Sequence, residues 1–600
     1  MLRLPAFIGG ICCLAAAGCA PQVGPGGSGE KVAYLSDRTA GPNTLDPVQG
    51  SSVYDNRACT MVYQTLLQYK YLRRPLELAP LLLEQMPVVS EDRKVYRFRL
   101  KENVFFHDDP CFPDGKGREL VASDFFYSLK RMAQDSNQPK GWWLLKDSIV
   151  GFDEYRQQQN DAETFDYDVP VEGLKVINDH EFEIYLKQPL YRFTYVLAMF
   201  QTAIIPREAV EHYQTKFARN PVGTGPFRLE RWDVGSQLIY VKNPNYWEEY
   251  YPADPGINKD GSEPYLGYSA DKALGFYVDA GKRLPLVDRV ELKFYVQAQP
   301  KWLKFRNHEL DYTMVPAENF EEAYIKRTAK IRQEFVDKGI RSHAEPLLDM
   351  IYIGFNMEDP DFGGYDEKHK WLRQAIALAI DWDEWNEAIY NDLNILYDGP
   401  IPPGLEGHPE HHTLSHSYRG PDLPRARKLL AKAGYPDGKG LPKLVYYLSR
   451  GEKNPEAAEI NQRNLAELGI RLDVRLVDFS TLTDALRNSR APFFSLAWGS
   501  DYPDAENNLQ LFYGPYKSPS SNNFNYDRPE YNALYERARV MSPSSERTKL
   551  YEQMRDMVIE DAPMIGSMAR TRYYLMHERL RNFKPTEDFF NWPKYLNVAE

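Results

Sequence analysis

The chain has 600 residues, of which 43% are hydrophobic, and its formal net charge at pH 7 is -12. This length exceeds what a single hydrophobic core usually holds, so we expect two or three lobes. The excess of acidic residues argues against a polyanionic partner such as nucleic acid and is typical of a soluble surface.

The first 18 residues have the pattern of a secretory signal. One arginine precedes an apolar run from Leu4 to Ala17, and small residues precede Cys19. The run is too short to span a membrane comfortably. Its ending, "AAGC", resembles a bacterial lipobox, in which cleavage leaves an N-terminal Cys19 that carries lipid and anchors the protein in the cell envelope. An ordinary signal peptide with a chance cysteine is the alternative.

Residues 19–31 are rich in Pro, Gly and Ser and predict a flexible tether. Cys12 and Cys13 are lost with the signal, and Cys19 is the lipidation site. Cys59 and Cys111 then remain, and a disulfide between them is possible in an oxidising compartment, although the sequence does not decide whether the two sulfurs meet.

Strand-like and helix-like patterns alternate along the body of the chain, which indicates α/β lobes. The segment "KVYRFRL" at 94–100 alternates apolar Tyr96, Phe98 and Leu100 with Arg97 and Arg99. This period of two predicts a strand with one buried face.

The segment "WLRQAIALAIDWDEW" at 371–385 has the period of a helix. Leu372, Ile376 and Ala379 fall on one helical face, which we expect to be buried. Asp381 with Glu384 predicts a capping box that starts a second helix.

The clearest unit runs from "LVYYLS" at 444–449 to "IRLDVRLV" at 470–477. Between these strands we expect a helix with Asn454 as N-cap, Pro455 at its first position and Gly469 after its end. A strand, helix and strand in this order predict a parallel, right-handed connection.

The chain contains none of the short motifs typical of serine hydrolases, zinc proteases or dinucleotide-binding enzymes. A secreted hydrolase built on scattered carboxylates stays an alternative. Four histidines (His408, His411, His412 and His416) lie close together and could offer imidazoles to Ni²⁺ or Zn²⁺. Because Pro and Gly flank them, we expect a surface loop without a specific metal role.

A set of segments carries a family resemblance. They are "NTLDP" (43–47), "VYRFRLKENVFFHDD" (95–109), "ASDFFYSLKRM" (122–132), "NPVGTGPFRLERW" (220–232), "VKNPNYW" (241–247), "IYIGFNM" (351–357), "LRQAIALAIDWDEW" (372–385) with the following "GPIPPG", and "ARKLLAKAGYPDG" (426–438). In this order they resemble the family 5 extracellular solute-binding proteins of ABC importers, which include oligopeptide- and dipeptide-binding lipoproteins. The resemblance runs from about residue 32 to the C-terminus.

The resemblance implies an α/β fold of the periplasmic-binding-protein type II kind, with two major lobes joined by a hinge and a small extra lobe. Lobe I would be discontinuous, comprising residues 32–57, 181–295 and 566–600. The small extra lobe would comprise residues 58–180, and lobe II residues 296–565. Closure of the lobes around a ligand would be a hinge motion.

The function implied is that of a receptor and not an enzyme. It would capture peptides, with oligopeptides expected, in the cleft between the lobes and deliver them to an ABC permease and ATPase on other chains. The chain itself would be a monomer that needs no cofactor and binds no ATP. Other members of the family bind oligosaccharides or nickel chelates, and these solutes are the alternatives to peptide.

The segment "FFSLAWGSDYPD" at 493–504 resembles the one with which peptide-binding members hold a free α-amino group on an aspartate. Asp501 would be that aspartate, because a poorly solvated carboxylate attracts an ammonium strongly. The alternative is that Asp501 only caps the turn that follows it. Trp498 would form a wall for the first side chain or belong to the core, and Tyr502 is included in the predicted site.

Backbone groups complete the predicted site. Ala497 and Gly499 are expected to pair with an extended peptide on one side, and Thr39, Ala40 and Gly41 on the other. Such pairing does not involve the side chains of the peptide, so the site would accept peptides of many sequences.

The chain departs from many relatives by an insert at about residues 248–283. Its Tyr, Pro and Gly content indicates an ordered excursion on the surface. The sequence does not decide whether this insert reaches the cleft.

Overall fold

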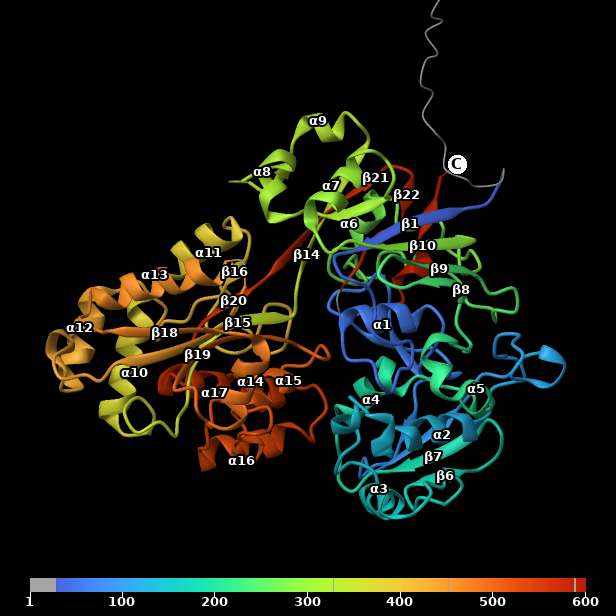
Figure 1. The fold of residues 1–600 in the computed structure, drawn as a ribbon, viewed down its shortest axis with the longest axis horizontal. Coiled ribbons are helices and arrows are strands. Elements are labelled where there is room, and N and C mark those ends of the chain that lie inside the picture. The colour runs from blue at the N-terminus through green and yellow to red at the C-terminus, as the bar shows by residue number, and fades with distance from the viewer. Residues whose placement is uncertain (1–28, 327, 452, 587–589, 600) are drawn as a thin grey trace, which may run out of the picture.

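The computed structural model describes residues 29–326, 328–451, 453–586 and 590–599. The secretory signal and Cys19 lie outside these residues. The described chain is an α/β structure with its strands in several separate sheets, as predicted. Figure 1 shows one body of the chain on the left, connected by long strands to a second body on the right.

Lobe I is built on a four-stranded sheet of segments far apart in the sequence. Its order is β1 (Val32–Asp37), β10 (Arg289–Phe294), β9 (Gln237–Lys242) and β8 (Phe227–Asp233). β1 is parallel to β10, and the other neighbours are antiparallel. Around the sheet lie α1 (Val53–Thr60), α6 (Tyr268–Ala273) and the pairs β2 (Leu67–Tyr69) with β3 (Leu78–Pro80) and β22 (Leu580–Arg581) with β23 (Asn597–Val598).

The small lobe has its own four-stranded antiparallel sheet, which extends past the predicted boundary at residue 180 and includes residues 181–185. The order is β4 (Val88–Val89), β5 (Val95–Arg99), β7 (Glu181–Tyr185) and β6 (Leu174–Val176), with α2 (Ala122–Ala133), α3 (Phe152–Asp161), α4 (Phe193–Val196) and α5 (Arg207–Tyr213) around it. The predicted alternation is confirmed, because β5 buries Tyr96 and Phe98 and exposes Arg97 and Arg99. Buried side chains of this lobe and of lobe I form one continuous core.

Lobe II is built on a six-stranded sheet. Its order is β16 (Ile395–Leu396), β20 (Met564–Ala569), β15 (Asp349–Phe355), β19 (Phe493–Gly499), β17 (Leu444–Ser449) and β18 (Leu472–Val477). Its helices are α10 (Glu367–Ala379), α11 (Trp382–Tyr390), α12 (Leu423–Lys432), α13 (Asn454–Ala466), α14 (Phe479–Arg487), α15 (Glu506–Leu509), α16 (Pro529–Ala538) and α17 (Ser545–Asp561). The predicted face of α10 is buried, and Asp381 caps α11 by accepting from the backbone N of Glu384.

The predicted strand, helix and strand unit is confirmed, since β17 and β18 are parallel and flank α13. The prediction of Asn454 as N-cap is wrong by one residue. Lys453 is the N-cap and Asn454 is the first helical residue. The Asn454 side chain instead donates from Nδ2 to the carbonyl of Ser449 at 2.6 Å, which ties the helix start to the end of β17. Gly469 has φ +72°, as expected of a residue that ends a helix.

A third sheet lies between the two major sheets. It has the order β11 (Tyr312–Met314), β21 (Thr571–His577) and β14 (Ile340–Pro346), and it packs with α7 (Ala298–Arg306), α8 (Phe320–Ala323), α9 (Gln333–Val336) and the pair β12 (Tyr324–Ile325) with β13 (Lys330–Ile331). In Figure 1 the chain crosses between the bodies twice, from β14 to β15 and from β20 to β21.

The two crossings lie side by side. The backbone N of Leu347 donates to the carbonyl of Arg570 at 2.8 Å, and the backbone N of Arg570 donates to Asp349 Oδ1 at 2.8 Å. The strand pairing does not follow the predicted boundaries at residues 296 and 566, because β14 pairs with β21 while β20 stays in the sheet of lobe II. We propose that the hinge, and thus the limit of lobe II, lies at these crossings.

Candidate functional site

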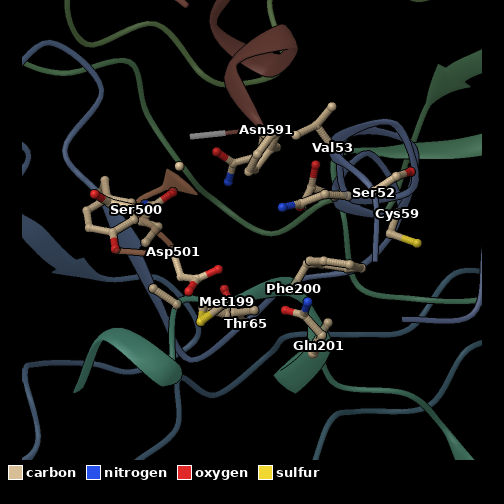
Figure 2. Close-up of a pocket in the computed structure, with 18 of the residues that line it drawn as sticks. Ser52, Val53, Cys59, Thr65, Met199, Phe200, Gln201, Ser500, Asp501 and Asn591 are labelled. Carbon is tan, nitrogen blue, oxygen red and sulfur yellow. The ribbon is translucent and has the colours of Figure 1, made fainter. Parts of the chain in front are cut away.

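A cavity of about 240 Å³ lies where the lobes and the crossings meet. Figure 2 shows Ser500 and Asp501 on one side, Ser52, Val53 and Cys59 on the other, and Met199 between them. The cavity is lined by α1, by residues 198–203, by the crossing residues 347–349 and Arg570, and by residues 499–501 after β19. Segments from both major lobes therefore enclose a single space.

Asp501 is the second residue after the end of β19, and its half-buried side chain is directed toward the cavity (Figure 2). Its Oδ2 accepts from Asn507 Nδ2 at 3.0 Å. Loss of solvent raises the pKa of Asp501 to about 6, although Asn507 and the nearby Arg192 oppose the shift. Among the described residues, no basic side chain, Arg192 included, is within ion-pair distance of Asp501.

The partner of Asp501 is a residue that the sequence prediction missed. Asn507 is fully buried, and its Oδ1 accepts from the backbone N of Asp501 at 3.1 Å and from Trp498 Nε1 at 2.9 Å. These bonds fix the orientation of the Asp501 side chain. The sequence signal that could have identified Asn507 is its position shortly after "SDYPD".

Trp498 packs against a core cluster of lobe II and is not among the residues that line the cavity. The Trp498 indole is half-buried and donates to Asn507 Oδ1. Tyr502 is also fully buried, and its hydroxyl donates to Glu506 Oε2. Neither side chain forms the wall of the cavity.

β19 has one edge available next to the cavity. It pairs with β15 along its whole length, with Ala497 opposite Ile351 and Gly499 opposite Asp349. On its other side it pairs with β17 only at Phe493 and Phe494. Ala497 and Gly499 are exposed, and a side chain at Gly499 would meet no atom within 4 Å. The arrangement leaves room for an extended ligand to approach this edge.

Thr39, Ala40 and Gly41 do not line the cavity. They form a turn after β1, in which the backbone N of Gly41 donates to Thr39 Oγ1 at 3.2 Å. Gly41 has φ +109°, and a Cβ there would lie 2.9 Å from the ring of Phe294. The wall opposite Asp501 comes instead from α1 and residues 198–203, which no sequence motif had marked.

The two sides of the cavity also touch directly beside Asp501. The ring of Tyr502 stacks on that of Tyr195 in α4, with centroids 5.4 Å apart and planes 7° apart. Arg547 lies over the ring of Tyr191, 4.9 Å from its centroid, and is paired with the buried Asp504. The structure is therefore a conformation in which the small lobe and lobe II are in contact.

Replacing Tyr195 with alanine is expected to weaken ligand binding without removing any ligand contact. The stacked pair contributes about 0.5–1.5 kcal/mol to the closed conformation, which corresponds to a loss of up to about tenfold in affinity. Isothermal titration calorimetry with a ligand that the wild type binds measures this loss. Tyr185→Ala, a tyrosine of the small-lobe sheet, is the control and should change affinity little; equal losses in both variants would contradict the argument.

The remaining residues that the sequence singled out are two cysteines and a cluster of histidines. Cys59 and Cys111 are both free thiols, Cys59 being buried beside the cavity. His408 Nε2 lies 2.6 Å from His412 Nδ1, and burial lowers the pKa of His408 to about 4. Within the described part of the chain, no three His, Cys, Asp or Glu side chains gather as a metal site would need.

Two lobes joined by paired crossings, with a cavity between them, are the arrangement of a binding protein that encloses its ligand. A family model of bacterial extracellular solute-binding proteins, family 5, matches residues 77–520, and the chain belongs to this family. The resemblance predicted from the sequence is thereby confirmed.

The helices in the described ranges were also compared with the length and hydropathy of a membrane span, and none of them meets both requirements.

Curated relatives match most of the chain at low identity. The periplasmic oligopeptide-binding protein OppA of Salmonella typhimurium is 24% identical over 82% of this chain and 78% of its own length. A probable di/tripeptide-binding protein of Pseudomonas aeruginosa is 24% identical over 91% of both chains. Heme-binding protein A of Haemophilus influenzae is 23% identical over 92% of this chain and 89% of its own.

Solved structures share the fold. HbpA2 from Haemophilus parasuis aligns with a TM-score of 0.72 and 21% identity, covering 95% of this chain and 100% of its own. The periplasmic binding protein DppA from Helicobacter pylori, solved with the peptide STSA, aligns with a TM-score of 0.68 and 20% identity over 95% of this chain and 98% of its own. The predicted fold class is therefore confirmed.

Proposed function

We propose that this protein is the substrate-binding receptor of an ABC importer and that it captures peptides, with Asp501 holding their free α-amino group. The observation that carries the proposal is a poorly solvated carboxylate that faces an interlobe cavity and has no ion-pair partner among the described residues. An ammonium brought there gains a charge-assisted contact in a site with little water. The free edge of β19 next to Asp501 supports pairing with the peptide backbone.

Ligand capture follows from this geometry. A peptide bound to Asp501 and to the opposite wall bridges both lobes, so it stabilises the closed arrangement relative to an open one. Rotation at the paired crossings near Asp349 and Arg570 would open and close the cavity. The closed receptor then presents its ligand to a permease, whose ATPase lies on other chains, and the receptor itself performs no catalysis.

The place of the protein in the cell is part of the proposal. Residues 1–18 would direct secretion, and lipid on Cys19 would hold the mature chain in the cell envelope through the tether at 19–31. We propose that it works there as a monomer. Incorporation of labelled palmitate, lost in Cys19→Ser, tests the lipid anchor.

Native mass spectrometry of the mature protein tests the peptide proposal. The protein is mixed with a peptide library and, separately, with the same library after N-acetylation. We expect selective retention of peptides with free amines. Equal retention of both libraries would contradict the role of Asp501. Retention of neither library would indicate that the ligand is an oligosaccharide or a metal chelate instead of a peptide. Hydrolysed peptides would indicate an enzyme instead.

Peptide affinity is expected to depend on pH through Asp501. Its pKa is about 6 in the free protein, and a bound ammonium lowers this pKa, so binding is full above pH 6 and is lost as the pH falls through 6. Between pH 7.5 and pH 5 the affinity should fall about tenfold. Calorimetry across this range measures the effect, and Asp501→Asn should abolish the dependence. If the peptide affinity of the wild type did not change with pH, the role of Asp501 would be contradicted.

A further inference from the structure

A second cavity, of about 440 Å³, lies next to the β2–β3 pair. Gln68 and Tyr69 line both this cavity and the one that contains Asp501. Much of its wall comes from the insert at 248–283. Its aromatic residues are Tyr69, Tyr71, Trp247, Tyr250, Tyr265, Tyr277 and Tyr595. The volume is in the range of small-molecule sites, roughly 300–1,000 Å³.

One cation of this aromatic cavity stands out. Lys101 Nζ lies over the ring of Trp247, 4.3 Å from its centroid, and donates to the carbonyl of Leu81. No carboxylate among the described residues is within ion-pair distance of Lys101. An ammonium has three donors, so Lys101 retains hydrogen-bonding capacity beyond its one protein acceptor.

The other cations of the cavity are already paired. Lys70 pairs with Glu77, and Arg73 donates to the carbonyl of Pro264 at 2.8 Å and lies 3.6 Å from Glu77. Of the two lining carboxylates, Glu249 accepts from Lys594 Nζ at 2.7 Å, and Glu248 accepts from the Tyr250 hydroxyl at 3.1 Å. Among the described residues, Lys101 is therefore the lining cation that has no carboxylate partner.

We propose that this cavity is a second binding site, which takes a small carboxylate that carries a flat apolar ring. The ammonium of Lys101 would pair with the carboxylate, and the ring would stack on the aromatic wall. The site is distinct from the one at Asp501, where the complementary ligand group is a cation. It also gives the insert a role, since the insert supplies Tyr250, Tyr265 and Tyr277 of the wall.

N-acetyl-phenylalanine is a suitable probe because acetylation removes the amine that Asp501 would hold. Calorimetry on the mature protein compares it with N-acetyl-phenylalanine amide, which lacks the charge, and with N-acetyl-glycine, which lacks the ring. We expect the aromatic acid to bind at least about tenfold more tightly than either. Equal binding of acid and amide, or no binding of any probe, would overturn the proposal.

Lys101→Met keeps the aliphatic stem and removes the charge. It should weaken binding of the aromatic acid about tenfold while peptide binding at Asp501 is retained, which shows that the variant is folded. Lys70→Met is the matched control, because Lys70 lines the same cavity but already pairs with Glu77. Asp501→Asn should leave binding of the acid unchanged. Unaltered affinity in a folded Lys101→Met would overturn the proposal.

A measurement on the wild type avoids any effect of substitution on folding. Burial lowers the pKa of Lys101 to about 8, with Glu249 and Glu84 opposing the shift and Lys594 adding to it. The protonated ammonium binds the carboxylate, so affinity for the aromatic acid is full below pH 8 and should fall about tenfold by pH 9. The amide should show no such fall. Identical profiles for the two probes would overturn the role of Lys101.

Discussion

Asp501→Asn is expected to reduce affinity for peptides with a free amino group by about a hundredfold or more. The variant leaves an ammonium in a poorly solvated site without its counter-charge, which costs about 3 kcal/mol. Asparagine can still accept a hydrogen bond from Asn507 Nδ2, the bond that orients Asp501 in the wild type, so we expect the fold to persist. Calorimetry with one peptide and its N-acetylated form measures the loss.

Asp478→Asn provides the control for this prediction. Asp478 is a carboxylate of the same lobe, and its side chain is 76% exposed. The Asp478→Asn variant should therefore bind peptide as tightly as the wild type does. The acetylated peptide should bind wild type and Asp501→Asn alike, since it has no ammonium to lose. If Asp501→Asn bound the free-amine peptide as tightly as the wild type, another group would have to hold the amine.

Arg131→Met is expected to destabilise the protein by about 3–5 kcal/mol, because it leaves a buried carboxylate unpaired. Arg131 of α2 binds Asp46 through two hydrogen bonds of 3.0 and 2.8 Å, and both side chains are only 4% exposed. The pair joins the loop "NTLDP" of lobe I to the small lobe. The shift of the urea unfolding midpoint and of the Tm measures the loss.

Two further variants separate burial from charge. Arg97 pairs with Glu183 on the small-lobe sheet with its side chain 61% exposed, so Arg97→Met should cost at most about 1 kcal/mol. The double variant Asp46→Asn with Arg131→Met should be more stable than Arg131→Met alone, since no charge is left buried. Equal costs for Arg131→Met and Arg97→Met would refute the argument from burial.

Local patterns in the sequence determined much of the fold. The alternation around Phe98 predicted β5, and the helical period around Ile376 predicted α10, because each pattern records which face of one element is buried. The parallel unit of β17, α13 and β18 followed from chain order and handedness. The N-cap at Lys453 shows the limit of such patterns, since the Asn454 side chain bonds backwards to Ser449 instead.

Asp501 was also predicted from the sequence, because its segment resembles the one with which peptide-binding members of the family hold an α-amino group. Only the tertiary structure decided which residues face it. The opposite wall comes from α1 and residues 198–203, and the half-buried indole of Trp498 donates to Asn507. The opposite wall depends on segments that lie hundreds of residues from Asp501 in the sequence, and the period of hydrophobic residues records that a face is buried but not which surface covers it.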